Sequence, residues 1–365
     1  MDIVEPTLIL DETRCRNNIS FMVSKARELQ LLLRPHFKTH QSLAIGRWFR
    51  EAGVRSITVS SVRMAQYFAR DGWDDITIAI PFNIRETTRL NELAKQAQVQ
   101  IIVLYPFMID HLDAVLDNEV GFLIEIDNGY HRTGIHPQAR DRIEEILEKE
   151  KTASHLSFRG FLTHAGNTYQ AASEKEINCI HLQTTSIMKN LKAEFLGRYP
   201  DIIISLGDTP SCSLMHDFNG IDEIRPGNFV FYDLMQKQLG VCREEDIAVC
   251  LACPVISRDE EKRKIVVYGG AIHLSREYLD SRNGKIYGKV VLLEEQGWSE
   301  SLEGTEVTGL SQEHGIIRMD NTAFNRIRIG DLIGILPVHS CLTANLMSSY
   351  LTLSGTRIDH LNSTR

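Results

Sequence analysis

The sequence lacks an excess of positive charge and lacks long hydrophobic runs. Its 365 residues carry a formal net charge of -8, and no part of the chain concentrates Lys and Arg into a basic stripe. This argues against a nucleic-acid partner. No apolar run approaches the roughly 20 residues that a membrane helix needs. The first residues, Met1 to Pro6, also lack the basic start and apolar core of a signal peptide. We therefore predict neither nucleic acid nor membrane as a partner.

The cysteines do not form a disulfide framework. The chain has seven, an odd number, without a Cys-x-x-Cys pair. Reduced thiols fit this usage better, so we expect a cytoplasmic protein. With 43% apolar and 24% charged residues the composition is that of a globular protein, and the length allows two domains.

Short apolar runs rich in β-branched residues alternate with amphipathic helical patterns along the first two thirds of the chain. Eight such runs occur, at residues 31–38, 56–60, 75–80, 99–105, 121–127, 157–164, 201–206 and 225–232. Strict alternation of eight strands with helices favours a closed, TIM-like (β/α)8 barrel over an open sheet.

Beyond about Glu245 the pattern changes. Strand-like runs joined by Gly, Asn and charged turns occur at residues 248–256, 264–268, 285–293, 305–310, 315–318 and 331–336. Little helical periodicity separates them, which predicts a smaller, mainly antiparallel β domain. An isolated first strand, residues 3–10, precedes the barrel pattern. We therefore predict a barrel domain at 13–240 and a β domain made of 1–12 with 241–365.

Lys38 is the most informative single residue. It ends the first barrel strand, in the stretch Arg-Pro-His-Phe-Lys-Thr-His at 34–40. Desolvation and the cationic neighbours Arg34, His36 and His40 are expected to lower its pKa, and a neutral amine can form a Schiff base with an aldehyde. The alternative is a surface lysine at a strand end.

Polar residues gather where the other barrel strands end, which is where barrel enzymes carry their chemistry. The candidates there are Arg132 after strand five, His164 and Tyr169 after strand six, Gly207, Asp208 and Thr209 after strand seven, and Tyr232 at the end of strand eight. The Gly-Asp-Thr-Pro-Ser segment at 207–211 suits a phosphate, because glycine admits the backbone and the hydroxyls donate. Each feature taken alone is better explained structurally: 207–211 as a Gly-Asp turn with a capping serine, Arg132 as part of a loop salt bridge, and Tyr169 as a half-buried packing residue.

A second cluster lies far along the chain, at His339 and Cys341. In an extended segment these side chains point to the same side. Imidazole with thiolate is a pair that zinc favours, and two ligands leave positions for water and substrate. Ordinary packing is the alternative.

Together these motifs resemble the fold-type III (alanine racemase-fold) pyridoxal phosphate enzymes, and more narrowly the D-serine dehydratase and D-threonine aldolase branch. The resemblance covers nearly the whole chain and rests above all on residues 34–40 and on His-x-Cys at 339–341. It implies that Lys38 binds the cofactor covalently and that Arg132 contacts its phenolic oxygen. It also implies that Tyr169 lies by the pyridine nitrogen and that Gly207 and Thr209 hold the phosphate. The predicted catalytic residues are Lys38, Arg132 and Tyr169, and the predicted cofactor-binding set adds His164, Gly207, Asp208, Thr209 and Tyr232.

The metal pair separates the two branches. The dehydratases are similar in using His-x-Cys for zinc, whereas the aldolases carry His-x-Asp and tend to use manganese or a similar ion. Cys341 therefore points to zinc and to the dehydratases. The sequence departs from the family pattern at Met64-Ala65 and at residues 268–273, which end in His273.

The resemblance implies a pyridoxal phosphate- and zinc-dependent lyase acting on D-β-hydroxy amino acids, with D-serine dehydratase-like elimination to a 2-oxo acid and ammonia as the first choice. A D-threonine aldolase, a 3-hydroxy-D-aspartate dehydratase and an amino acid racemase are the alternatives within the family. A cofactor-binding homeostasis protein without turnover is the alternative from another class. The family also implies a homodimer in which the β domain of one subunit closes the barrel mouth of the other.

Overall fold

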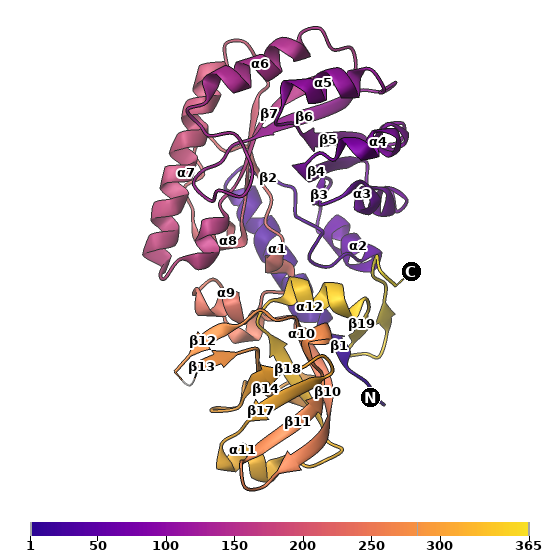
Figure 1. The fold of residues 1–365 in the computed structure, drawn as a ribbon, viewed down its shortest axis with the longest axis vertical. Coiled ribbons are helices and arrows are strands. Elements are labelled where there is room, and N and C mark those ends of the chain that lie inside the picture. Colours follow the sequence, from indigo (N-terminus) through magenta and orange to yellow (C-terminus); the bar gives the residue numbers. More distant parts are fainter. Residues whose placement is uncertain (1, 283, 364–365) are drawn as a thin grey trace. The chain divides into compact units, whose positions relative to one another are not determined.

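The computed structural model describes residues 2–282 and 284–363, and its chain divides into two compact units (Figure 1). The barrel unit consists of residues 20–38 and 46–227, and the β unit consists of residues 2–19, 39–45 and 228–363. Among the described residues, no helix is both long enough and apolar enough to cross a membrane.

The barrel unit is built on eight parallel strands. In spatial order they are β2 (Leu32–Leu33), β9 (Glu223–Ile224), β8 (Ile203–Gly207), β7 (Leu156–His164), β6 (Val120–Glu125), β5 (Gln98–Ile102), β4 (Asp75–Pro81) and β3 (Ile57–Val59). A parallel bridge between His36 and Thr58 joins the segment after β2 to β3 and so closes the ring. The predicted (β/α)8 fold is confirmed.

Helices alternate with these strands along the chain, and Figure 1 shows α3 to α7 on the outer side of the strands. The helices are α1 (Glu12–Glu28), α2 (Leu43–Glu51), α3 (Val62–Ala69), α4 (Thr87–Ala94), α5 (Pro106–Asp113), α6 (Arg140–Glu150), α7 (Glu174–Phe195) and α8 (Thr209–Leu214). Single turns of 3-10 helix occur at Ile84–Glu86, Gly166–Gln170, Asn228–Val230 and Glu244–Asp246.

The eighth barrel strand is earlier and shorter than the predicted 225–232. Regular pairing covers Glu223–Ile224, and Arg225 adds one more hydrogen bond, from its N–H to the Leu206 carbonyl (2.8 Å). Pro226 then has no N–H to donate. Residues 228–230 turn into a 3-10 helix instead.

The β unit contains a sheet of ten strands. Its order is β11 (Lys264–Tyr268), β17 (His314–Arg318), β16 (Glu306–Leu310), β14 (Gly288–Glu294), β18 (Leu332–Pro337), β10 (Val249–Asp259), β1 (Thr7–Leu10), β19 (Tyr350–Thr352) and β20 (Arg357–Ile358), with β15 (Gly297–Trp298) beside β14. All pairs are antiparallel except β1 with β19. Because β10 also pairs with β11, part of the sheet closes on itself.

All six strands predicted beyond residue 245 are present, and the predicted antiparallel sheet is confirmed. The sequence analysis missed the small hairpin of β12 (Leu279–Ser281) and β13 (Gly284–Ile286), and the helices α9 (Leu234–Gln238), α10 (Ala271–Leu274), α11 (Asn321–Arg326) and α12 (Ser340–Met347). Most of these are too short to show a period.

Residues near the C-terminus fix the segment that follows Lys38 in sequence. The carboxylate of Asp359 accepts hydrogen bonds from the N–H groups of Leu43 (2.8 Å) and Ala44 (3.1 Å), the first residues of α2. The Tyr350 hydroxyl donates to the carbonyl of His40 (2.5 Å). Asp359 therefore caps α2, a role that a nearby Ser or Asp usually fills.

Candidate active site

Lys38 lies at the carboxyl end of the first barrel strand, and the backbone before it is fixed. The N–H of His36 donates to the Pro226 carbonyl (2.8 Å), and that of Phe37 donates to the Thr58 carbonyl (2.8 Å). The buried Phe37 ring lies 5.0, 4.9 and 5.2 Å, centroid to centroid, from three further aromatic rings, those of Phe49, Phe68 and Trp73. The position of the Lys38 backbone is therefore determined by packing, while its side chain is exposed at the mouth.

The three neighbours expected to lower the pKa of Lys38 do not add free positive charge. Arg34 is buried and forms ion pairs with Glu223 (2.5 Å) and Asp75 (2.5 Å). Burial, together with the positive charge of Lys38, lowers the pKa of His36, and burial lowers that of His40 to about 3. Both imidazoles are neutral at physiological pH, so this expectation was wrong.

The positive charge at the mouth comes from other residues. Burial and the charges of Lys38 and Arg132 lower the pKa of His164 to about 3. The same two cations and Arg225 also lower the pKa of His36. Lys38, Arg132 and Arg225 are thus close enough to disfavour protonation of both imidazoles, although the chain as a whole is acidic. Such a site favours a ligand with several negative charges.

Residues after β7 and β8 meet in space. His164 hydrogen-bonds through Nδ1 to the Gly207 carbonyl, and the hydroxyl of Tyr169 accepts a hydrogen bond from the N–H of Thr209 (3.1 Å). The rings of His164 and Tyr169 lie 6.3 Å apart. The structure therefore brings together four residues that sequence reasoning selected from separate loops.

The N-terminus of α8 carries buried hydroxyls. Thr209 Oγ1 and Ser211 Oγ have no hydrogen-bond partner among the residues that the structure describes. Asp208 caps the helix by accepting from the N–H of Ser211 (2.6 Å), and burial raises its pKa to about 6. A Cβ atom at position 207 would lie 3.0 Å from a guanidinium nitrogen of Arg225. Glycine at this position therefore lets the Arg225 side chain pack against the backbone.

Arg132 projects from a closed loop after β6. A parallel β-bridge between Ile126 and Ile135 joins the two ends of the loop. Within it, the Asp127 carboxylate accepts hydrogen bonds from the N–H groups of Gly129 (3.0 Å) and His131 (2.9 Å). The exposed Arg132 guanidinium lies 5.3 Å from the centre of the Tyr130 ring. The loop thus holds a cation at the mouth without neutralising it.

His339 and Cys341 belong to the β unit. They do not lie on an extended segment as expected, because β18 ends at Pro337 and α12 begins at Ser340. The two side chains nevertheless interact. Burial disfavours the charged imidazole, but a hydrogen bond to Cys341 and its negative charge raise the pKa of His339 to about 9, and the same pair lowers the pKa of Cys341. Within residues 2–282 and 284–363 no group of three or more His, Cys, Asp or Glu side chains could hold a metal.

Tyr232 also lies in the β unit. It is buried, its φ is +49°, and its N–H donates to the Asn228 carbonyl (2.8 Å). Its predicted contact with a cofactor stays a prediction.

Two family models match the sequence. The family described as "Alanine racemase, N-terminal domain" matches residues 10–234, and that described as "Putative serine dehydratase domain" matches residues 248–353. The first match spans more than half of the chain. The chain belongs to the alanine racemase family. The resemblance predicted from the motifs, to the fold-type III pyridoxal phosphate enzymes, is confirmed.

Known proteins similar to this chain match it over nearly its whole length and nearly their own. A D-serine dehydratase of Dictyostelium discoideum is 28% identical over 96% of this chain and 93% of its own. A D-threo-3-hydroxyaspartate dehydratase of Delftia sp. (strain HT23) is 28% identical over 96% and 94%. The crystal structure of the Delftia enzyme matches with a TM-score of 0.90 at 26% identity, covering 98% of both chains. A cysteine-to-alanine mutant described as D-threo-3-hydroxyaspartate dehydratase "in the metal-free form" matches with a TM-score of 0.91 at 25% identity, again over 98% of both chains. The prediction of a lyase in this family is confirmed.

The residues of the barrel mouth fit pyridoxal phosphate, the cofactor of the family. Buried hydroxyls without a partner at the start of α8 suit a phosphate group, and the three cations suit its charge. An amine at the strand end suits its aldehyde.

Sequence reasoning on this family member missed two charged residues near the mouth. Arg225 donates to the Thr163 carbonyl (2.9 Å) inside the barrel, and Glu125 is buried near it with one carboxylate oxygen unpartnered among the described residues. Burial raises the pKa of Glu125, and Thr133, Arg132 and Arg225 oppose that rise. Both residues occupy ends of barrel strands, which is the signal that could have identified them.

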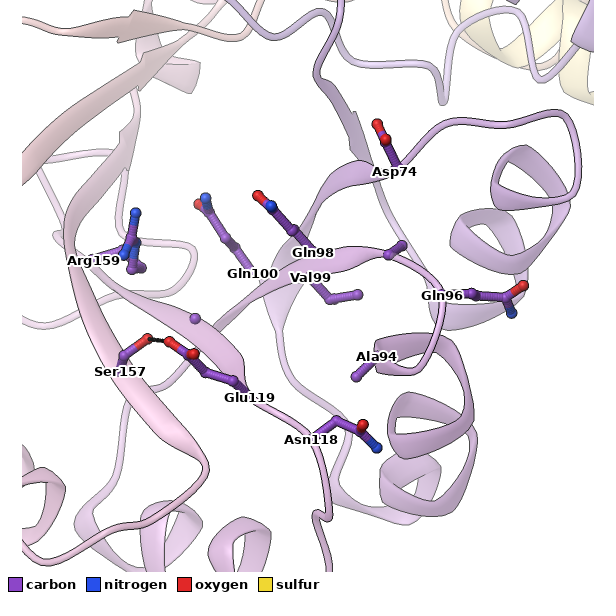
Figure 2. Close-up of a pocket in the computed structure, with 12 residues that line it drawn as sticks. Asp74, Ala94, Gln96, Gln98, Val99, Gln100, Asn118, Glu119, Ser157 and Arg159 are labelled. Carbon is purple, nitrogen blue, oxygen red and sulfur yellow. Dashed lines mark hydrogen bonds between the residues drawn. The ribbon is translucent and has the colours of Figure 1, made fainter.

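A pocket of about 650 Å³ in the barrel unit lies elsewhere (Figure 2). Figure 2 shows Asp74, Gln98, Glu119 and Ser157 around it, at the amino ends of β4 to β7. Since the strands are parallel, the pocket is at the opposite end of the barrel from Lys38. It therefore lies apart from the candidate site around Lys38.

Proposed function

We propose that this chain is a pyridoxal phosphate- and zinc-dependent lyase that eliminates water from a D-β-hydroxy amino acid, as D-serine dehydratase does. The observation that carries the proposal is the barrel mouth, where Lys38, Arg132 and Arg225 surround neutral imidazoles beside the unpartnered hydroxyls of Thr209 and Ser211. The relatives named D-serine dehydratase and D-threo-3-hydroxyaspartate dehydratase support the same reaction.

The phosphate would be held at the start of α8 by the backbone at Gly207 and by the hydroxyls of Thr209 and Ser211. Asp208 keeps that turn in place through its cap on α8. At the ring, Arg132 would contact the phenolic oxygen, and His164 is held in one orientation by its bond to the Gly207 carbonyl.

Tyr169 would lie at the pyridine nitrogen. Its oxygen accepts the N–H of Thr209 (3.1 Å), which holds the phenol beside the start of α8. A neutral hydroxyl withdraws less charge than an acid would, so the ring would draw electrons weakly.

Lys38 would hold the cofactor covalently and, once displaced by substrate, would take the proton from the substrate Cα. When bound, pyridoxal phosphate supplies the electron sink that makes this proton removable. Arg132 and Arg225 disfavour a second ammonium nearby, so they would help Lys38 to act as a neutral base.

His339 and Cys341 would hold the metal. Nitrogen and sulfur donors together favour zinc over manganese or magnesium, and zinc supplies a Lewis acid for the departing β-hydroxyl, a poor leaving group without such help. Support comes from the structure of a relative whose cysteine-to-alanine mutant is described as metal-free.

D-threonine aldolase activity is the second candidate, because an aldolase of Arthrobacter sp is 22% identical over 93% of this chain. It would use the same amine and metal but would break the Cα–Cβ bond, giving glycine and an aldehyde. Cys341, where the aldolases carry an aspartate, favours the dehydratase.

The test is a holoenzyme preparation with its visible spectrum, metal content and products from D-serine, D-threonine and 3-hydroxy-D-aspartate. We expect 2-oxo acid and ammonia, formation of which is lost on chelation and restored by zinc. We expect the absorbance of lysine-bound cofactor to be absent from Lys38→Ala. Glycine and an aldehyde as products would identify an aldolase instead of a dehydratase. Absorbance of lysine-bound cofactor that persists in Lys38→Ala would overturn the assignment of the lysine.

We also propose that the chain forms a homodimer in the cytoplasm. Four large apolar side chains of the β unit are 37% to 43% exposed, those of Ile272, Tyr278, Leu342 and Leu346. All seven cysteines are free thiols, which suits a reducing compartment. Sedimentation equilibrium of the holoenzyme tests the dimer, and a monomer at micromolar concentration would refute it.

A further inference from the structure

The sulfur of Cys341 lies among hydrogen-bond donors that the predicted metal pair does not include. The hydroxyl of Thr39 is 3.3 Å from Sγ, and the amide nitrogen of Asn228 is 3.4 Å from it. Thr39 is fully buried and Asn228 is 6% exposed, so water does not compete strongly with either contact. The Asn228 amide donates to Sγ, whereas either atom of the Thr39 contact could be the donor. A metal-bound thiolate has no proton and can only accept, so both residues would donate to Cys341 once it binds a metal.

The orientation of the Asn228 amide is fixed by an acidic neighbour. Its nitrogen donates to the Asp233 carboxylate (2.7 Å) and lies 3.1 Å from Ser340 Oγ. The same carboxylate accepts the N–H of Ser340 (3.0 Å), at the first residue of α12. A flipped amide would set its oxygen against the carboxylate. The NH2 group is thus held toward Sγ.

Hydrogen bonds to a thiolate ligand withdraw electron density from the sulfur. Less charge then reaches the metal, which keeps more of its own positive charge and polarises a bound oxygen more strongly. In known metal sites, mutation of residues that hydrogen-bond to a metal ligand changes metal affinity or activity by about 10- to 100-fold.

We propose that Thr39 and Asn228 are positioning residues of the metal centre, which donate to the Cys341 thiolate and thereby strengthen the Lewis acid that it binds. The proposal rests on the proposed function, since it requires that His339 and Cys341 hold a metal. Thr39 and Asn228 would act through the Cys341 sulfur and would not need to contact the substrate. Thr39 also follows Lys38 directly in sequence, so the proposal gives the threonine of the Lys-Thr-His stretch a role of its own.

The test is the absorption spectrum of the full chain, freed of metal with a chelator and reloaded with Co²⁺. A thiolate bound to Co²⁺ gives a sulfur-to-metal charge-transfer band in the near ultraviolet, and the band moves to longer wavelength when the sulfur becomes richer in electrons. We expect Thr39→Val to shift the band to longer wavelength and Thr39→Ser to restore it. Asn228→Ala should shift it in the same direction.

Thr343→Val is the matched control. Thr343 is a buried threonine on α12, but its hydroxyl donates to the Leu274 carbonyl (3.3 Å). We expect its band to match that of the wild type. Far-ultraviolet circular dichroism identifies any variant that has not folded, and Asn228→Ala carries the test if Thr39→Val does not fold.

The outcomes separate this proposal from the proposed function. A wild-type chain without the band, or a band that survives in Cys341→Ala, would mean that Cys341 is not a metal ligand, and the metal site itself would fall. A normal wild-type band that stays unmoved in both Thr39→Val and Asn228→Ala would overturn only the role of the two donors.

Discussion

Replacing Arg34 by methionine should cost the barrel unit a large part of its stability. The Arg34 side chain is 3% exposed and its partner Glu223 is 1% exposed, whereas Asp75, the other partner, is 29% exposed. Asp75 can be hydrated after the substitution and also keeps a hydrogen bond from Ser56 (2.6 Å). Glu223 is too buried to be hydrated. It would keep the hydrogen bond from the Ser205 hydroxyl and the nearby charge of Arg225, but it would lose its direct ion pair.

Removing one partner of a buried ion pair costs about 3–5 kcal/mol. Folded proteins are stable by about 5–15 kcal/mol, so Arg34→Met should lower the free energy of unfolding by a large fraction. The double variant Arg34→Met/Glu223→Gln should recover about half of the loss, because it removes the uncompensated charge. Arg34→Lys keeps the charge but loses the bidentate geometry toward Asp75, so its loss should lie between those of the wild type and Arg34→Met.

The assay is urea unfolding of the cofactor-free chain, followed by circular dichroism and by fluorescence. A loss below about 1 kcal/mol at neutral pH would refute this account of Arg34.

Three further predictions follow from the packing and charges of single residues. Gly160→Ala should prevent folding or cost about 3 kcal/mol or more, because its Cβ would lie 2.0 Å from the Ile203 carbonyl oxygen, and thermal unfolding tests this. Glu125→Gln should increase the free energy of unfolding, and urea titrations should show that this gain grows from pH 4 to pH 7. Burial raises the pKa of Glu125 in the folded state. The stabilising contribution of the protonated carboxyl is therefore present at low pH and is lost as the pH rises. Asp359→Ala should cost about 1–2 kcal/mol, because α2 loses its cap, and should increase amide exchange at Leu43 and Ala44, whereas unchanged exchange there would contradict the capping role.

Local pattern was enough to predict the architecture. The alternation of apolar runs and amphipathic segments located the barrel strands, and Lys38 was placed at a strand end because the run 31–33 and the helix pattern after it bracket the residue. The strands beyond residue 245 were likewise visible as runs bounded by turn residues. These features depend on neighbours in the chain.

The charge state of the site depends on distant residues and could not be predicted. Arg34 looked like a free cation beside Lys38, but its partners Asp75 and Glu223 are 41 and 189 residues away in the chain. His339 and Cys341 looked extended, but Asp233, 107 residues before Ser340, accepts the N–H that begins α12. Asp208 proved to be the N-cap of α8, whereas the alternative that the sequence offered for 207–211 was a turn capped by a serine.

The contacts made by Tyr350 and Asp359 can form only near the end of translation. They hold His40 and Ser42 across 310 and 317 residues of chain. At about 5–20 residues per second, the ribosome delivers these anchors roughly 15 to 60 seconds after the segment that they secure. The turn that follows Lys38 in sequence therefore lacks these contacts for most of the translation of the chain. If Lys38 binds the cofactor aldehyde as proposed, the backbone next to it gains its last anchors only when the final residues have been added.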